Sequence, residues 1–213
     1  MKRILIVGAG GQIGSELTTY LRKIYGASNV VATDVRECGK LAEGGPFEVL
    51  NALDAKAMSS VVERYKIDAI FNLVALLSAV GEKNPQTAWN INIGALMNAL
   101  EVAREYGCAL FTPSSIGAFG PTSPKDKTPQ DTIMQPTTIY GVCKVTGELL
   151  GNYYFRRYGV DTRSVRFPGI ISNVTLPGGG TTDYAVEIYY EAIKAGRFTC
   201  PVPGDVYMDM IYM

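Results

Sequence analysis

The sequence contains no histidine, and this absence narrows its chemistry more than any residue that is present. Without imidazole there is no histidine general base, and every zinc site with a histidine ligand is excluded. The four cysteines lie far apart, at Cys38, Cys108, Cys143 and Cys200, so there is no C-x-x-C metal or redox pair. We therefore expect no metal site, and acid–base chemistry must rely on other side chains.

Charge and hydrophobicity argue against two further classes of partner. Twenty basic residues balance twenty acidic ones and no Lys/Arg cluster stands out, which argues against nucleic acid. The longest nearly apolar run, Ala69 to Val80, is interrupted by Asn72 and is too short to span a membrane. The first predicted strand begins at residue 3, so we expect no signal peptide, and the separated cysteines favour reduced thiols in a cytoplasmic protein.

An apolar run near the start, Ile4 to Val7, breaks into glycines and resumes as a helix pattern up to Tyr25. Such runs are typical of buried parallel strands, and glycines let the backbone turn tightly and approach a pyrophosphate. The helix would direct its free N–H groups at that phosphate. Asp34 stands where an acid is expected to bind the adenosine ribose. The alternative is a tight strand-to-helix connection with Asp34 as a solvated acid.

Helix and strand patterns alternate along the chain. Apolar spacing predicts helices over 11–25, 55–65, 86–106, 138–158 and 182–195, and apolar β-rich runs predict strands over 4–7, 29–33, 47–50, 108–111 and 160–167. Glycines stand at helix-stop positions, namely Gly26, Gly107, Gly159 and Gly196. This alternation predicts an α/β fold, a Rossmann-type doubly wound parallel sheet.

The pattern changes towards the end of the chain. A proline-rich loop lies between Gly120 and Pro136, and loops of this length inside a domain are usually functional. Beyond Phe167 the dipeptide Pro168-Gly169 breaks the alternation, and we place a boundary near Ile171. The expected organisation is a Rossmann domain that binds NAD over residues 1–171 and a small, incomplete C-terminal substrate region over residues 172–213.

Tyr140 and Lys144 lie four residues apart on a predicted helix, so they share one face. A tyrosine pKa of about 10 must fall by about three units, or about 4 kcal/mol, before the phenol acts as a base near neutral pH. A nearby ammonium favours the phenolate by that order in a partly buried site. The pair can therefore supply a base in a chain without histidine. The alternative is a surface tyrosine that covers a lysine stem.

Taken in order, the motifs resemble the extended short-chain dehydrogenase/reductase family, which includes nucleotide-sugar epimerases. They are Gly8, Gly11 and Gly14 in G-x-x-G-x-x-G spacing with Ile13 in place of a glycine, then Asp34, Asn92, Ser114-Ser115, and Tyr140 with Lys144. The resemblance implies NAD as cofactor and a catalytic triad of Ser115, Tyr140 and Lys144. The cofactor-binding residues that it implies are Gly8, Gly11, Gln12, Ile13, Gly14, Asp34, Asp54 near the adenine, Leu73, Ala75, Asn92 in a proton path through water, Tyr140, Lys144 and Pro168.

Two adjacent serines compete for the catalytic position. Ser114 is as able as Ser115 to supply the positioned hydroxyl. Ser115 is preferred because it stands five residues before Gly120, as in the family's Ser-x-x-x-Tyr-Gly pattern. Phe119 replaces the tyrosine of that pattern, which weakens the case for a sugar nucleotide as substrate.

Further segments are similar to one branch of the family, the short-chain type of L-threonine 3-dehydrogenase. They are Asn72-Leu-Val-Ala-Leu-Leu-Ser78-Ala, Phe167-Pro-Gly-Ile-Ile with Gly178-Gly-Gly-Thr181-Thr-Asp183-Tyr-Ala, and the ending Met208 to Met213. The resemblance implies L-threonine as substrate, in contact with Ser78, Ser115, Tyr140, Thr181 and Asp183. An aspartate at a helix start can pair with an ammonium group. The alternative is that Thr181 or Thr182 caps the helix and Asp183 complements its dipole.

The implied reaction is oxidation of L-threonine to 2-amino-3-oxobutanoate, with the Tyr140 phenolate as base and hydride transferred to NAD+. Ser115 would hydrogen-bond the substrate oxygen, and Lys144 would lower the pKa of Tyr140. The resemblance also implies a homodimer formed through the helices over 86–106 and 138–158. A nucleotide-sugar epimerase or dehydratase and a non-catalytic dinucleotide-sensing protein stay open. Extended-type members are longer than this chain, so we expect its substrate pocket to be incomplete.

Overall fold

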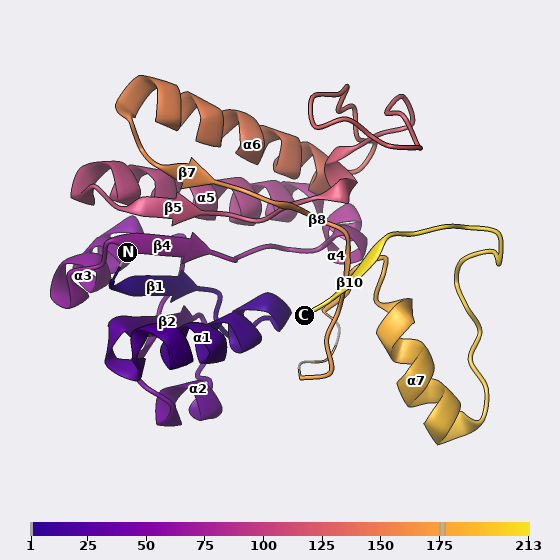
Figure 1. Cartoon of the computed structure of the whole chain (residues 1–213), viewed down its shortest axis with the longest axis horizontal. Coiled ribbons are helices and arrows are strands. Elements are labelled where there is room, and N and C mark those ends of the chain that lie inside the picture. The colour runs from indigo at the N-terminus through magenta and orange to yellow at the C-terminus, as the bar shows by residue number, and fades with distance from the viewer. Residues whose placement is uncertain (1, 175, 177) are drawn as a thin grey trace.

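The computed structural model describes residues 2–174, 176 and 178–213. Its centre is a six-stranded sheet in which every pairing is parallel, in the order β3-β2-β1-β4-β5-β7 (Figure 1). The strands are β1 (Ile4–Val7), β2 (Val30–Asp34), β3 (Phe47–Val49), β4 (Ala69–Asn72), β5 (Ala109–Phe111) and β7 (Thr162–Arg163). The strand order reverses direction between β1 and β4, so the predicted Rossmann-type doubly wound sheet is confirmed.

Helices cover both faces of this sheet. The helices of the described residues are α1 (Gln12–Tyr25), α2 (Gly39–Glu43), α3 (Ala55–Tyr65), α4 (Ser78–Lys83), α5 (Pro85–Tyr106), α6 (Ile139–Tyr158) and α7 (Tyr184–Ala195), with 3-10 turns η1 (Ala27–Asn29) and η2 (Ile116–Ala118), and α7 lies apart from the sheet. Ile4 and Ile6 of β1 belong to the same buried cluster as Leu21 of α1. Leu5 points the other way and joins the cluster that contains Leu100 of α5. Burial on both faces explains why β1 is apolar at every position.

The predicted helix stops are confirmed. Gly107 and Gly159 end α5 and α6 in the left-handed conformation, with φ of 67° and 72°. Their N–H groups donate back to carbonyls of the last helical turn, those of Ala103 and Phe155. Side chains disfavour this conformation, which is why glycine marks the end of each helix in the sequence.

The structure corrects the single strand expected over residues 160–167. The chain forms β7, leaves the sheet, and then forms β8 (Arg166–Phe167), which pairs with the two-residue strand β6 (Ser114–Ser115). Pro168 has no N–H group to continue a ladder. The strand pattern resumes directly afterwards, because β9 (Gly169–Ile171) pairs with β10 (Met210–Tyr212). The last helix begins at Tyr184, two residues later than expected, and the short helices α2 and α4 are absent from the sequence prediction.

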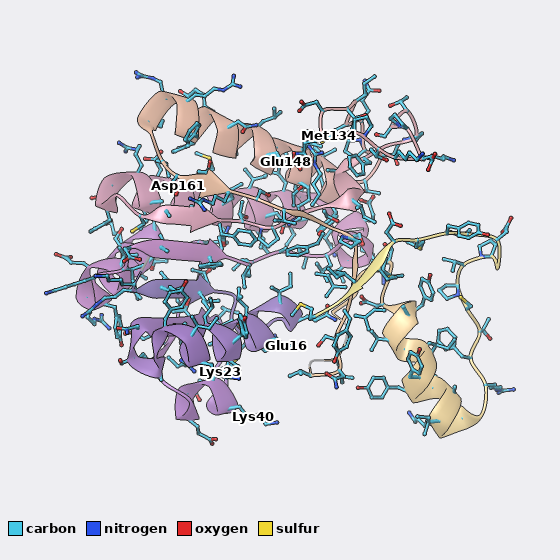
Figure 2. The ribbon with its side chains drawn as sticks, viewed as in Figure 1. Glu16, Lys23, Lys40, Met134, Glu148 and Asp161 are labelled. Atoms are coloured by element: carbon cyan, nitrogen blue, oxygen red, sulfur yellow. The ribbon has the colours of Figure 1, made fainter. Side chains whose placement is uncertain are left out.

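The segment that carries α7 lies to one side of the sheet, and β10 returns from it towards α1 (Figure 1). Glu16 lies at the end of α1 nearest to this region (Figure 2), and its carboxylate accepts a hydrogen bond from the buried Ser172 hydroxyl. This contact joins the start of α1 to the chain just after β9. None of the helices in the described part of the chain is long and apolar enough to cross a bilayer.

Candidate active site

The glycine turn between β1 and α1 is held by main-chain hydrogen bonds. The N–H groups of Gly8 and Ala9 both donate to the Thr33 carbonyl, at 2.9 Å each. A Cβ on Gly14 would lie 2.4 Å from the Gly8 carbonyl oxygen, so α1 can approach β1 this closely only with glycine there. Among the described residues, a Cβ on Gly11 would meet only the Gly8 carbonyl, at 3.4 Å. The turn is therefore closed against the strand at Gly14 and open at Gly11.

Other predicted cofactor residues surround this turn. Gln12 and Ile13 form the first turn of α1, where main-chain N–H groups lack partners within the helix. The Leu73 N–H donates to the Val7 carbonyl at 2.9 Å, which places Leu73 directly beside the end of β1. These positions combine free donors with an apolar wall, as a dinucleotide site requires.

Asp34 ends β2 and is only 8% exposed. One of its carboxylate oxygens accepts from the Gly10 N–H at 2.9 Å, and the other accepts from the Arg36 N–H at 3.2 Å. Gly10 was not predicted as a site residue, although it stands directly before Gly11 in the glycine turn. A Cβ on Gly10 would lie 2.9 Å from Asp34 Oδ2 and 2.7 Å from Cys38 Sγ. The carboxylate thus supports the glycine turn and keeps lone pairs for ribose hydroxyls.

Asp54 stands at the N-terminus of α3 and is exposed. Its side chain accepts a hydrogen bond from the Ala57 N–H at 2.9 Å, as an N-cap aspartate commonly does. Contact between Asp54 and an adenine stays a prediction.

The structure brings Ser115, Tyr140 and Lys144 together. Tyr140 and Lys144 lie one turn apart on α6, and Ser115 lies at the end of β6. Ser115 hydrogen-bonds the Tyr140 side chain. A Cβ on Gly117 would lie 3.2 Å from the Tyr140 ring and 3.4 Å from Ser115 Oγ, so glycine leaves room for both groups. Lys144 Nζ donates to the Pro113 carbonyl at 2.7 Å and lies 5.3 Å from the centre of the Tyr140 ring.

Burial dominates the electrostatics of this trio. Burial raises the pKa of Tyr140 above its ordinary value, and the hydrogen bond from Ser115 acts in the opposite direction without reversing it. Burial also lowers the pKa of Lys144 to about 8, although the nearby Cys143 acts to raise it. Burial therefore dominates the pKa of Tyr140 in this structure, because the apolar surroundings disfavour both charged forms. The expected lowering of the Tyr140 pKa by Lys144 stays a prediction.

We predict a measurable effect of Lys144 on the pH dependence of stability. The unfolded chain holds the Lys144 proton more tightly than the folded chain, so the free energy of unfolding rises with pH between about 8 and 10.5. Urea titrations measure this free energy at each pH. Relative to Lys144→Met, the free energy of unfolding of wild type should rise by roughly 3 kcal/mol over this range. A difference that stays constant with pH would contradict the assignment.

Asn92 was expected to support a proton path. Its amide makes two hydrogen bonds to the Leu76 main chain, accepting from the N–H at 2.7 Å and donating to the carbonyl at 3.1 Å, and the proton path stays a prediction. Asn72 Oδ1 is buried without a hydrogen-bond partner among the described residues. It borders a cavity of about 30 Å³ that Ala75, Asn92 and Lys144 also line. A cavity of this size has room for a water molecule, and Asn72 Oδ1 at its wall offers such a water an acceptor.

Two of the residues assigned to the substrate, Ser78 and Thr181, are in contact. The Thr181 N–H donates to Ser78 Oγ at 3.3 Å, which joins the turn before α7 to the start of α4. Asp183 Oδ2 accepts from the N–H groups of Gly179 and Gly180, at 2.8 and 2.7 Å. Asp183 is itself the N-cap residue of α7 and its side chain makes no cap bond to the helix. The alternative in which Thr181 or Thr182 caps α7 is therefore wrong.

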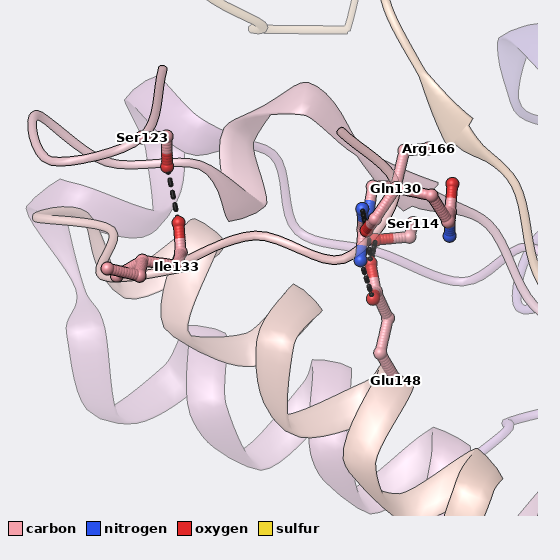
Figure 3. Close-up of polar contacts among 6 residues, drawn as sticks. All are labelled: Ser114, Ser123, Gln130, Ile133, Glu148 and Arg166. Carbon is pink, nitrogen blue, oxygen red and sulfur yellow. Dashed lines mark hydrogen bonds and ion pairs between the residues drawn. The ribbon is translucent and has the colours of Figure 1, made fainter. Parts of the chain in front are cut away.

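The two adjacent serines have different surroundings. Ser114 is buried, and its hydroxyl donates to the Glu148 carboxylate, which also binds Arg166 (Figure 3). Ser115 is the serine that faces Tyr140. Pro168, two residues after Arg166, separates β8 from β9 beyond the end of the sheet. Glu148 and Arg166 were missed at the sequence level, although Glu148 continues the helical spacing of Tyr140 and Lys144.

The model of the NAD dependent epimerase/dehydratase family matches residues 4–213. The chain belongs to this family. Relatives from Staphylococcus haemolyticus and Staphylococcus aureus, both described as uncharacterized epimerase/dehydratases, are 60% and 58% identical over 215 residues. These alignments cover 100% of this chain but 68% and 67% of the relatives, so the chain spans about two thirds of their length.

Solved structures of L-threonine dehydrogenases are similar to this family member. The enzyme from Clostridium difficile has a TM-score of 0.95 at 54% identity, covering 100% of this chain and 67% of that one. The holo form of a GalE-like L-threonine dehydrogenase from Cupriavidus necator has a TM-score of 0.94 at 50% identity, covering 99% and 68%. A UDP-glucose 4-epimerase from Thermotoga maritima has a TM-score of 0.86 at 23% identity and covers 99% and 69%, which shows the shared fold alone.

The cofactor of this epimerase/dehydratase family member is NAD, and the family with its dehydrogenase neighbours supports an NAD-dependent oxidoreductase. The site fits such a cofactor. A Cβ would find space at Gly11 but not at Gly14, so the turn is open on the side of Gly11. Next to Gly11, the first turn of α1 offers main-chain N–H groups that have no partner within the helix. Asp34 supplies a carboxylate for the ribose hydroxyls at the end of the neighbouring strand.

Proposed function

We propose that the protein oxidises the 3-hydroxyl of L-threonine to give 2-amino-3-oxobutanoate, with NAD+ as hydride acceptor. The observation that carries the proposal is the meeting of Ser115, Tyr140 and Lys144 at one end of α6. It is supported by the meeting of Ser78 with Thr181 beside α4. Similarity to L-threonine dehydrogenases at 54% and 50% identity supports the same substrate, whereas the epimerase neighbour is only 23% identical.

In this proposal Tyr140 takes the proton of the substrate hydroxyl, and Ser115 donates a hydrogen bond to the same oxygen. Lys144 has a pKa of about 8, so most of its side chains carry a charge at pH 7, and that charge favours the Tyr140 phenolate. NAD+ supplies the site that receives the hydride. Asp183 binds the substrate ammonium through the lone pairs that Gly179 and Gly180 leave free.

The proposed NAD contacts are those that the resemblance implies. The residues are Gly8, Gly11, Gln12, Ile13, Gly14, Asp34, Asp54, Leu73, Ala75, Asn92, Tyr140, Lys144 and Pro168. Support comes from the open side of the turn at Gly11 and from the strand-end carboxylate of Asp34. For Asn92 the contact is indirect, because its amide holds the Leu76 main chain that passes the site.

A nucleotide-sugar epimerase or dehydratase is the second candidate, favoured by the descriptions of the Staphylococcus relatives. Such an enzyme would need cationic groups for a diphosphate, and the sequence after Phe167 has no basic cluster. A non-catalytic dinucleotide sensor would have no use for Ser115, Tyr140 and Lys144 in one place.

Absorbance at 340 nm distinguishes these functions. We expect NADH to form with NAD+ and L-threonine, and not with UDP-galactose or without substrate. NAD that is released only on denaturation, together with conversion of UDP-galactose, would favour the epimerase. Binding of NAD without turnover of either substrate would favour the sensor.

We also propose a homodimer formed through α5 and α6. Large apolar side chains are exposed on α6, among them Leu149 at 61%, and a groove lies beside Tyr153 and Arg156. Leu149→Glu should shift the sedimentation coefficient towards that of a monomer, because it places a charge in the interface. Tyr20→Glu on α1, where the side chain is equally exposed, is the control. Equal behaviour of the two variants would place the interface elsewhere.

A further inference from the structure

A largely buried ion pair lies one helical turn beyond Lys144. The Arg166 guanidinium makes two hydrogen bonds to the Glu148 carboxylate, at 2.9 Å through Nε and 2.7 Å through Nη2. Both side chains are only 15% exposed, and the Ser114 hydroxyl donates to the same carboxylate (Figure 3). Burial acts to raise the pKa of Glu148, but hydrogen bonds from Arg166 and Ser114 outweigh it and leave the pKa below its ordinary value.

The free side of Arg166 reaches the long loop between Gly120 and Pro136. Its Nη1 donates to the Gln130 carbonyl at 2.9 Å, and its guanidinium stacks 5.3 Å from the centre of the Phe119 ring. Within the loop, the Ser123 hydroxyl donates to the Ile133 carbonyl (Figure 3), which holds its two arms together. The loop is thus a braced unit that Arg166 connects to the body of the protein.

The same ion pair adjoins the elements that carry the proposed catalytic groups. Ser114 precedes Ser115 on β6 and pairs in register with Arg166 on β8. Glu148 follows Lys144 by four residues on α6. We propose that Glu148 and Arg166 are positioning residues that fix Ser115 against Tyr140 and hold the loop 121–136 as a wall of the substrate pocket. The substrate part of this proposal rests on the proposed function.

A stabilising role alone does not account for this arrangement. The desolvation of these two largely buried charges offsets much of their attraction, so an apolar pair of similar volume would serve stability about as well. The planar guanidinium fork fixes directions, because it binds a carboxylate with two donors and keeps a third for the Gln130 carbonyl. A lysine keeps the charge but not this geometry, which makes Arg166→Lys the sharpest variant.

The experiment compares Arg166→Lys and Ser114→Ala with a control, Arg163→Lys, in the whole chain. Arg163 on β7 forms a comparable ion pair with Asp161, but there the side chains are 76% and 51% exposed. The first readout is limited trypsin digestion, with cleavage after the exposed Lys125 and Lys127 followed by mass spectrometry. Because the loop loses its anchor, trypsin should cut the loop of the Arg166→Lys variant about tenfold faster than that of wild type, while the rest of the fold is unchanged. Arg163→Lys and Ser114→Ala should be cut at the wild-type rate.

The second readout is kinetic. Arg166→Lys should raise KM for L-threonine several-fold, whereas Ser114→Ala should lower kcat with KM unchanged, since it loosens only the strand that carries Ser115. Digestion of Arg166→Lys at the wild-type rate would overturn the anchoring of the loop whether or not L-threonine is the substrate. Wild-type kinetics in both variants, in a protein that oxidises L-threonine, would overturn the positioning role.

Discussion

Replacing Tyr140 with phenylalanine should stop hydride transfer and leave NAD binding intact. The variant keeps the buried ring beside Gly117 but removes the hydroxyl that Ser115 contacts, so the proposed base is lost without a cavity. Loss of a general base lowers turnover by about 10²- to 10⁴-fold, and with no histidine in the chain no imidazole can replace it. NADH formation at 340 nm measures the turnover, and calorimetric titration with NAD+ measures the binding.

Tyr20→Phe is the matched control for this experiment. Tyr20 lies on α1, is 61% exposed and is outside the site and the proposed dimer interface, so its variant should turn over like wild type. Near-normal turnover by Tyr140→Phe would remove Tyr140 from the mechanism. Loss of NAD binding together with turnover would show that the phenol serves the cofactor and not the proton.

Replacing Gly14 with alanine should destabilise the fold strongly. The new methyl group would lie 2.4 Å from the Gly8 carbonyl oxygen and 2.7 Å from the Ala9 Cα. Both are main-chain atoms at the end of a fully buried strand and cannot yield as a side chain would. We expect the free energy of unfolding, measured with urea, to fall by about 2 kcal/mol or more.

Gly11→Ala is the comparison that separates folding from binding. Its methyl group would lie 3.4 Å from the nearest described atom, and Gly11 has a φ of −76° that alanine adopts readily. The stability of this variant should therefore match that of wild type, while its affinity for NAD falls by about tenfold or more because the methyl group occupies the open side of the turn. Equal losses of stability in the two variants would contradict the distinction drawn between the glycines.

Periodicity predicted the main helices closely because the forces that set their ends are local. The helix over 55–65 and the stops at Gly107 and Gly159 rest on apolar spacing and on a conformation that favours glycine. The division after residue 171 stays a prediction. The path between Thr162 and Ile171 was predicted less well, because strand pairing depends on partners far away in the chain. β8 pairs with β6 and β9 with β10, and no local pattern announces either partner.

The sequence by itself predicted a dinucleotide site and determined that its base could not be histidine. Both follow from composition and short-range spacing at Gly8, Gly11, Gly14 and Asp34, and from the absence of imidazole. Only the tertiary structure decided which serine faces Tyr140, since Ser114 turns towards Glu148. It also decided the charge balance of the site, because burial comes from elements that are distant in sequence. That burial lowers the pKa of Lys144 and raises that of Tyr140.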